Sequence, residues 1–211
     1  SNAYLLPSEL STYLSGRYVE VGMLPLAFAE YADFCGVSFK PGSVVALDLF
    51  GEPVLFDDLF ERYLAYGGMP AIASLEVRQA EHAAYMSSIY EAVASRDIVN
   101  RERNRRQSRV TNPELLRNVA DFLADNIGNQ VSASSIASTL TSAGVRTSHP
   151  TAASYISALN EAYLFYRVSR YDLHGKAILR TNPKEYIVDL GLRSYLGGYR
   201  ATDMGRIFEN I

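Results

Sequence analysis

The stretch that decides the fold, residues 112–168, reads NPELLRNVADFLADNIGNQVSASSIASTLTSAGVRTSHPTAASYISALNEAYLFYRV. Asn112 is a natural N-cap, and Pro113 suits the first position of a helix. Apolar residues then recur at helical spacing, and Gly128 marks the end of this predicted helix. The predicted inward face consists of Leu115, Leu116, Val119, Phe122, Leu123 and Ile127.

Two more helices are predicted downstream. Ser132 can cap the second and Ser148 the third, which has Pro150 just inside it, and Gly144 supplies the turn between them. The second helix would bury Ile136, Ala137 and Leu140, and the third Ala153, Ile156, Leu159 and Ala162.

Two strand-like runs, 164–168 and 185–188, follow the helices, and residues 171–182 between them would form a wing. Three helices followed by two strands are the order of a winged helix-turn-helix. Helices also dominate residues 25–110, where we expect no strand. The predicted fold class is therefore mainly α with small β content, a helical region followed by a winged helix-turn-helix domain.

Charge is distributed unevenly along the 211 residues. Residues 1–95 hold four basic and twelve acidic side chains, a net of −8, whereas residues 96–211 hold sixteen basic and eleven acidic, a net of +5. This asymmetry indicates two modules with different partners. The most basic run, 101–109, lacks apolar periodicity and is expected to be a linker.

The sequence shows no run of about 18 apolar residues and no secretion leader, so we expect no membrane association. The single cysteine, Cys35, lies on a predicted apolar helix face. We expect a buried, inert thiol in a reducing, cytoplasmic environment.

Nearly the whole chain resembles the central and C-terminal part of the predicted AAA+-superfamily-like ATPases of bacteria and archaea. These proteins end in an uncharacterised domain that contains a winged helix. The matching motifs, in order, are Tyr13–Glu20, Leu24–Tyr31, Tyr66–Pro70, Arg96–Val99, Ala124–Gly128, Leu159–Leu164, Tyr186–Arg193 and Gly205–Asn210.

The resemblance implies a domain organisation. Residues 1–22 would end the ATPase core, 23–100 would form a helical AAA+ lid-like region and connector, and 101–111 a basic linker. Residues 112–198 would form the winged-helix domain and 199–211 the start of a truncated C-terminal region. The chain also stops within a predicted helix, so we expect a trimmed part of a longer protein.

Asn2 and Arg17 would lie near the nucleotide, according to the resemblance. Ser1-Asn2-Ala3 resembles the continuation of the nucleotide-sensing turn, although it also fits the scar of a cleaved tag. Arg17 would reach a γ-phosphate, or it is a strand-end arginine paired to a carboxylate.

No Gly-x-x-x-x-Gly-Lys-Ser/Thr motif occurs in the sequence, so this chain alone should not hydrolyse ATP. ATP and Mg²⁺ are implied for the full-length family, whereas we expect no cofactor in this chain. Gly67-Gly68 could cradle a phosphate, but without a following lysine it is better interpreted as a helix stop. The full-length protein is expected to be an ATPase and this part of it to have no activity.

The winged helix could contact DNA, yet the predicted third helix, 150–161, contains no lysine or arginine. Basic residues around it could grip backbone phosphates with little base readout. These predicted DNA-binding residues are Arg146, His149, Arg167, Arg170 and Lys176. A winged helix that docks onto a protein, or self-associates, is the alternative.

No catalytic or metal-binding constellation stands out. The three histidines are far apart in sequence, and Glu185 and Asp189 form a carboxylate pair without an evident pocket. The first hypothesis is thus a regulatory, partner-binding C-terminal part of an AAA+-like ATPase. The second is a DNA-binding winged-helix module or transcription regulator.

Overall fold

The computed structural model describes residues 21–73, 79–99, 110–172, 177–178, 182–200 and 204–210. Their contacts define two compact units. Of the described residues, unit 1 comprises 21–22 and Ser88–Ile187, and unit 2 comprises Met23–Ser87 together with the segment from Val188 onward. Helices dominate both units and the sheets are small, which confirms the predicted mainly α class.

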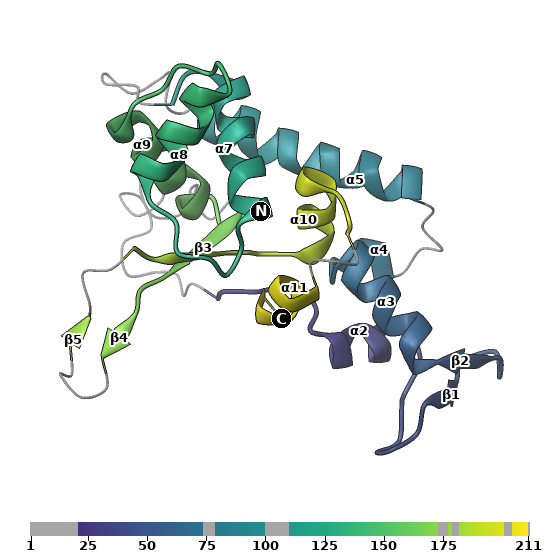
Figure 1. Ribbon diagram of the computed structural model, residues 1–211. Coiled ribbons are helices and arrows are strands. Elements are labelled where there is room, and N and C mark those ends of the chain that lie inside the picture. Colours follow the sequence, from purple (N-terminus) through teal and green to yellow (C-terminus); the bar gives the residue numbers. More distant parts are fainter. Residues whose placement is uncertain are drawn as a thin grey trace, which may run out of the picture. The chain divides into compact units, whose positions relative to one another are not determined.

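Unit 1 contains the three predicted helices, which lie together in Figure 1. They are α7 (Pro113–Asp125), α8 (Ala133–Ser142) and α9 (His149–Glu161). Asn112, Ser132 and Ser148 are their N-caps, and each side chain accepts a hydrogen bond from a backbone N–H of the first turn. The predicted caps are therefore confirmed.

The core of unit 1 is apolar and joins all three helices. The inner face of α9 differs slightly from the prediction: Ala152 and Tyr155 are buried with Ile156 and Leu159, whereas Ala153 is only half-buried. The Tyr155 hydroxyl also accepts hydrogen bonds from the backbone N–H groups of residues 111 and 112 at 3.2 and 3.1 Å. This tyrosine therefore ties α9 to the start of α7.

The predicted strand runs pair with each other in unit 1. β3 (Phe165–Val168) and β6 (Lys184–Ile187) are antiparallel, with Phe165 opposite Ile187 and Val168 opposite Lys184. The segment after α7 runs along β6 as well, through an isolated bridge between Gln130 and Lys184. Between β3 and β6 in sequence lie two short paired strands, β4 (Tyr171–Asp172) and β5 (Ala177–Ile178).

Unit 2 is built from α2 (Phe28–Phe34), α3 (Phe56–Tyr66), α4 (Pro70–Ala73), α10 (Leu190–Gly197) and α11 (Met204–Asn210). Its core includes Tyr31, Leu64, Leu190 and Ile207. Phe28 contacts the rings of Phe56, Phe60 and Tyr63 edge-on, with centroids 4.9–5.5 Å apart. Helix α5 (Gln79–Glu91) contains the boundary between the units and continues as a π-helical stretch, η3 (Ala92–Val99).

The expectation of no strand between residues 25 and 110 is wrong. β1 (Val45–Leu47) and β2 (Pro53–Leu55) form an antiparallel hairpin that leads directly into α3 (Figure 1). The loop is stabilised by Asp48, whose Oδ1 accepts hydrogen bonds from the N–H groups of Phe50 and Glu52, both at 2.8 Å. This side-chain turn allows the chain to reverse between the two strands.

Residues 188–198 fall in the same compact unit as the 23–87 segment. One reason is Gly191 in α10, where an added Cβ would overlap the Tyr66 carbonyl oxygen. The missing side chain permits α10 to approach the end of α3 at backbone distance.

Several predicted features lie outside the described residues. They are Asn2, Arg17, Lys176 and the basic run 101–109. Within the described part of the chain, none of the helices combines the length and apolar character that crossing a membrane requires.

Candidate functional site

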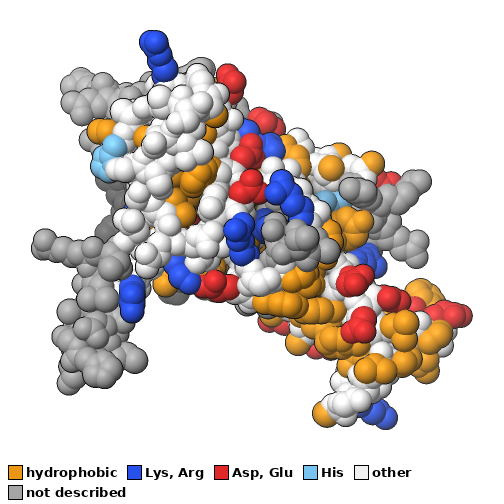
Figure 2. All heavy atoms as spheres, viewed as in Figure 1, with side chains coloured by type: hydrophobic (Ala, Val, Ile, Leu, Met, Phe, Trp, Pro, Cys, Tyr) orange, Lys and Arg blue, Asp and Glu red, His pale blue; other side chains and the backbone are white. Residues whose placement is uncertain are grey.

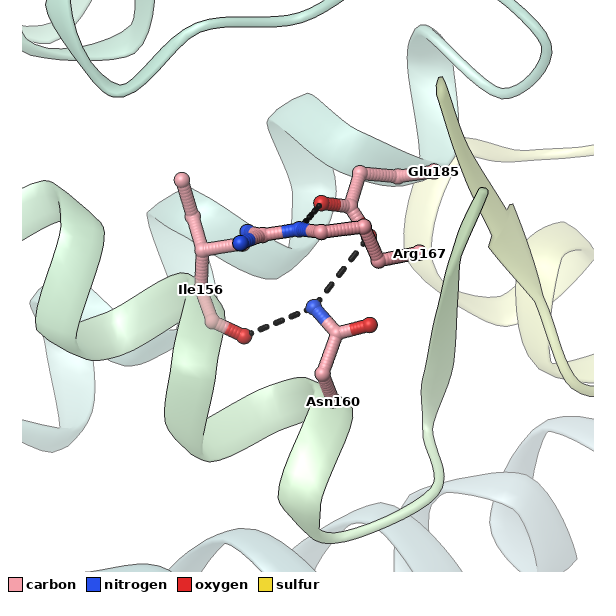
Figure 3. A network of polar contacts seen from close by, with 4 residues as sticks. All are labelled: Ile156, Asn160, Arg167 and Glu185. Atoms are coloured by element: carbon pink, nitrogen blue, oxygen red, sulfur yellow. Dashed lines mark hydrogen bonds and ion pairs between the residues drawn. The ribbon is translucent and has the colours of Figure 1, made fainter. Parts of the chain in front are cut away.

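Arg167, predicted to contact DNA, is bound to a buried carboxylate in unit 1. Its Nε donates to Glu185 Oε1 at 2.8 Å, across the β3–β6 pair in which the two residues are directly opposite (Figure 3). The Glu185 side chain is 2% exposed and that of Arg167 is 45% exposed. The ion pair therefore links the two strands. It also engages Arg167, one of the cations predicted to contact phosphate, with a carboxylate of the same unit.

Asn160 completes this network from helix α9. Its Nδ2 donates to Glu185 Oε2 at 3.1 Å and to the Ile156 carbonyl oxygen at 2.9 Å (Figure 3). One carboxylate thus joins α9, β3 and β6. The helical period of α9 alone could not show this role, because it does not indicate which strand lies beside Asn160.

The remaining predicted cations of unit 1 that the structure describes are exposed. Arg146 and His149 lie on either side of the Ser148 cap, at the N-terminus of α9, and Arg170 follows β3. Backbone N–H groups at a helix N-terminus favour anions, so Arg146 and His149 lie where a phosphate could also contact the helix end. Together with Arg170 they form the described part of the predicted DNA surface that remains accessible.

The outer face of α9 offers few groups for reading bases. Ser154 Oγ donates to the Pro150 carbonyl oxygen at 3.0 Å, and Ser157 Oγ donates to Glu161 Oε1 at 3.0 Å. Their hydroxyl protons are therefore used within the helix, and Glu161 adds a negative charge that repels phosphate.

An aromatic surface follows the end of α9. Tyr163 is 45% exposed and has φ of +56°, a conformation that L side chains adopt at a cost of about 1–2 kcal/mol. Its ring centroid is 6.3 Å from that of Tyr166, which is half-buried, and Val168 is exposed on the same strand. Tyr163, Tyr166 and Val168 together are called the tyrosine surface below.

Asp189 forms the second buried polar centre, within unit 2. Its carboxylate accepts hydrogen bonds from Gly68 N at 2.8 Å and Leu192 N at 3.1 Å, and also from the N–H of Gly191. Asp189 is thereby the N-cap of α10 and a ligand of the Gly67-Gly68 turn at once. Burial raises the pKa of Asp189 to about 6, although the backbone donors oppose this shift.

The Gly67-Gly68 turn is confirmed as a helix stop. Gly67 is the C-cap of α3 with φ of +80°, and the Gly68 N–H binds Asp189. The backbone N–H of Gly68 thus donates to the Asp189 carboxylate, whereas in a phosphate-binding loop this N–H would have to be free to bind phosphate. The sequence contains a signal for the Asp189 cap that was not used: in the order Asp189-Leu190-Gly191, an acidic residue directly precedes a helix and can act as its N-cap.

Glu185 and Asp189, noted in the sequence as a carboxylate pair, each have their own set of hydrogen-bond partners. Cys35 is not a fully buried helix-face residue. It follows α2 as the C-cap, is half-buried, and its Sγ donates to the Ala73 carbonyl oxygen at 3.4 Å.

His82 in α5 is buried, and burial lowers its pKa. Its ring centroid is 4.9 Å from that of Tyr66. Among the described residues, no group of three or more His, Cys, Asp or Glu side chains is placed to hold a metal ion.

Residues 57–203 match the family described as "Domain of unknown function (DUF8612)". The match covers more than half of the chain, which therefore belongs to this family. An uncharacterised protein of Haemophilus influenzae is 37% identical over 211 residues, 100% of this chain and 48% of the relative. An uncharacterised protein of Methanocaldococcus jannaschii is 25% identical over 100% of this chain and 44% of its own length. The chain spans about half the length of these relatives, and no solved structure matches it.

Arg167→Ala should lower the free energy of unfolding by about 2 kcal/mol, because it leaves the buried Glu185 carboxylate with the Asn160 amide but without its cation. The measurement is urea denaturation of the whole chain. Arg170→Ala, an exposed change three residues away, is the control and should stay within about 0.5 kcal/mol of wild type. An equal loss from Arg167→Ala in a Glu185→Gln background would contradict the assigned ion pair.

Asp189→Asn should remove a pH dependence from stability. The folded pKa of about 6 lies above the unfolded value of about 3.9, so the folded state binds this proton more tightly. The resulting stabilisation is complete below about pH 4 and is lost as the pH rises through 6, a change on the order of 3 kcal/mol. Urea denaturation at pH 4 and pH 7 should therefore show wild type losing stability relative to Asp189→Asn.

The control for this titration is Glu52→Gln, which changes an exposed carboxyl of the same unit. Its difference from wild type should stay within about 0.5 kcal/mol at both pH values. A wild type-minus-Asp189→Asn difference that is constant with pH would contradict the raised pKa.

Proposed function

We propose that this chain is the regulatory, partner-binding and non-catalytic part of an AAA+-like ATPase, in which unit 1 is a winged helix that docks onto a protein. The order of elements supports the winged helix: three helices, then β3 and β6, with β4 and β5 between them as the wing. The segment after α7 also pairs with β6, through an isolated antiparallel bridge between Gln130 and Lys184. This architecture alone does not define a function.

The ATPase assignment rests on the ordered family-like motifs and on the length of the relatives. Because this chain covers 48% and 44% of them, each has room for a nucleotide-binding core elsewhere. The sequence has no phosphate-binding loop motif, and the Gly68 amide already binds Asp189. Nucleotide chemistry would therefore belong to the remainder of such a protein, together with ATP and Mg²⁺.

The single observation that favours a protein partner over DNA is the chemistry of the α9 outer face. It carries no lysine or arginine, its serine hydroxyls donate within the helix, and Glu161 is negative. Beside it, the tyrosine surface exposes apolar and aromatic area, the kind of area that is enriched in protein interfaces. The strained Tyr163 backbone fits a residue kept in place for contact.

The ATPase proposal is tested with the longer Haemophilus influenzae relative and the 211-residue chain side by side. We expect the relative to bind a fluorescent ATP analogue and to release phosphate from MgATP, and this chain to do neither. Competition by unlabelled ATP is the control for specific binding. If the relative fails to bind ATP, the ATPase assignment is wrong. If this chain itself binds ATP, the proposal that it is the non-catalytic part is wrong.

DNA binding remains the second candidate because Arg146 and His149 are exposed at the N-terminus of α9. Phosphate contacts at this helix end, together with Arg170, would position a duplex without base readout. In this arrangement Arg167 contributes little, because its Nε is bound to Glu185.

Fluorescence anisotropy with a labelled random-sequence duplex separates the two candidates. Under the protein-docking proposal we expect a Kd weaker than about 10⁻⁴ M at about 200 mM salt, the weak end of non-specific binding. Arg146→Ala/Arg170→Ala is compared with Lys40→Ala/Arg200→Ala, which removes the same charge from exposed sites of unit 2. Micromolar binding that only the first variant weakens, by about tenfold, would favour the DNA-binding module instead.

A further inference from the structure

The β1–β2 hairpin of unit 2 has an outer face made entirely of apolar side chains. The cross-strand pairs on this face are Val45 with Leu55 and Leu47 with Pro53, and all four residues are exposed. Leu47 alone is 62% exposed. Between these pairs, Ala46 and Val54 point the other way and pack against the unit 2 core.

This pattern is unusual for a two-stranded sheet with one face on a core. Antiparallel sheets of that kind normally alternate apolar inward and polar outward. Here both faces are apolar, although one of them faces solvent. Contiguous exposed apolar patches of this kind mark interaction sites in soluble proteins.

The hairpin loop extends the same surface. Leu49 and Phe50 at the tip are 81% and 89% exposed. Two hydrogen bonds from backbone N–H groups to Asp48 Oδ1 fix the loop, and Gly51 adopts φ of +84° within it. Because the turn is fixed by its own hydrogen bonds, it presents these two side chains in a defined place. In Figure 2 hydrophobic side chains cover the region of this hairpin.

Acidic side chains lie next to the apolar face in sequence, in the hairpin loop and in the turn after β2. Residues 21–73 contain seven acidic and two basic residues, a net of −5. Asp48 and Glu52 lie in the hairpin loop, and Asp57 and Asp58 lie in the first turn of α3 directly after β2. Glu52, Asp57 and Asp58 are exposed, and Asp48 is half-buried. Figure 2 shows acidic groups beside the apolar area. A bound partner would therefore meet apolar contacts bordered by negative charge.

We propose that the outer face and tip of the β1–β2 hairpin are a docking surface for a protein segment that carries both apolar and Lys or Arg side chains. Apolar contact supplies the affinity, and the acidic border selects a basic partner. A second copy of this chain, docked hairpin to hairpin, would place two acidic borders against each other. Anionic membrane headgroups would be repelled by the same charge.

This inference goes beyond the proposed function, because the surface belongs to unit 2 and depends neither on the winged helix nor on ATP. Failure of the experiment below would leave the tests of unit 1 unaffected, and the reverse also holds.

The test uses the whole chain and a short labelled peptide of alternating leucine and lysine. We expect fluorescence anisotropy to show binding in the range of tens of micromolar, weakened at least tenfold by Leu47→Ser/Phe50→Ser. Glu52→Gln/Asp58→Asn should weaken binding about threefold and reduce its salt dependence, because it removes two border charges. A peptide with glutamate in place of lysine should not bind.

The matched control is Met23→Ser/Tyr199→Ser, which removes exposed apolar side chains away from the hairpin sequence and should bind like wild type. Circular dichroism verifies that each variant is folded. Equal binding by the Leu47→Ser/Phe50→Ser variant, or no binding at about 200 μM peptide, would overturn the proposal.

Two further measurements can also overturn it. A dimer seen by sedimentation velocity that Leu47→Ser/Phe50→Ser abolishes would assign the surface to self-association. Binding to phosphatidylcholine vesicles that the same variant abolishes would assign it to a membrane.

Discussion

The carboxylate of Asp189 accepts hydrogen bonds from the Gly68, Gly191 and Leu192 amides, and the packing of unit 2 depends on this contact. It joins the turn after α3 to the start of α10, two segments more than 100 residues apart in sequence. Glycine is needed on both sides: an added Cβ on Gly68 would overlap the Leu26 carbonyl oxygen, and one on Gly191 would overlap that of Tyr66. The burial that raises the pKa of Asp189 therefore follows from close backbone packing.

A second buried carboxylate has the corresponding role in unit 1. Glu185 binds Arg167 from the neighbouring strand and Asn160 from α9, so that one side chain relates the sheet to the third helix. In both centres a buried carboxylate fixes the relative position of neighbouring helices and strands. Apolar packing alone would specify that position less strictly.

The surfaces proposed for binding are separate from these buried centres. In unit 1 the tyrosine surface and the exposed Arg146 and His149 offer contrasting chemistries, aromatic for protein and basic for phosphate. In unit 2 the hairpin combines apolar and acidic groups. Each unit thus has a rigid internal framework and an exposed region of distinct composition, in agreement with the charge asymmetry of the two halves.

The sequence alone determined the helices of unit 1 and their caps, because Asn112, Ser132 and Ser148 act on backbone amides two or three residues away. It also indicated the β3 and β6 runs and the helix stop at Gly67, which are local properties as well. The β1–β2 hairpin was missed because its turn depends on one aspartate, and its outer face lacks the polar alternation that normally marks such a strand. Only the tertiary structure decided that Arg167 binds Glu185 and that Asp189 binds Gly68, since a residue's neighbours across long sequence separations are set by packing and leave no local pattern.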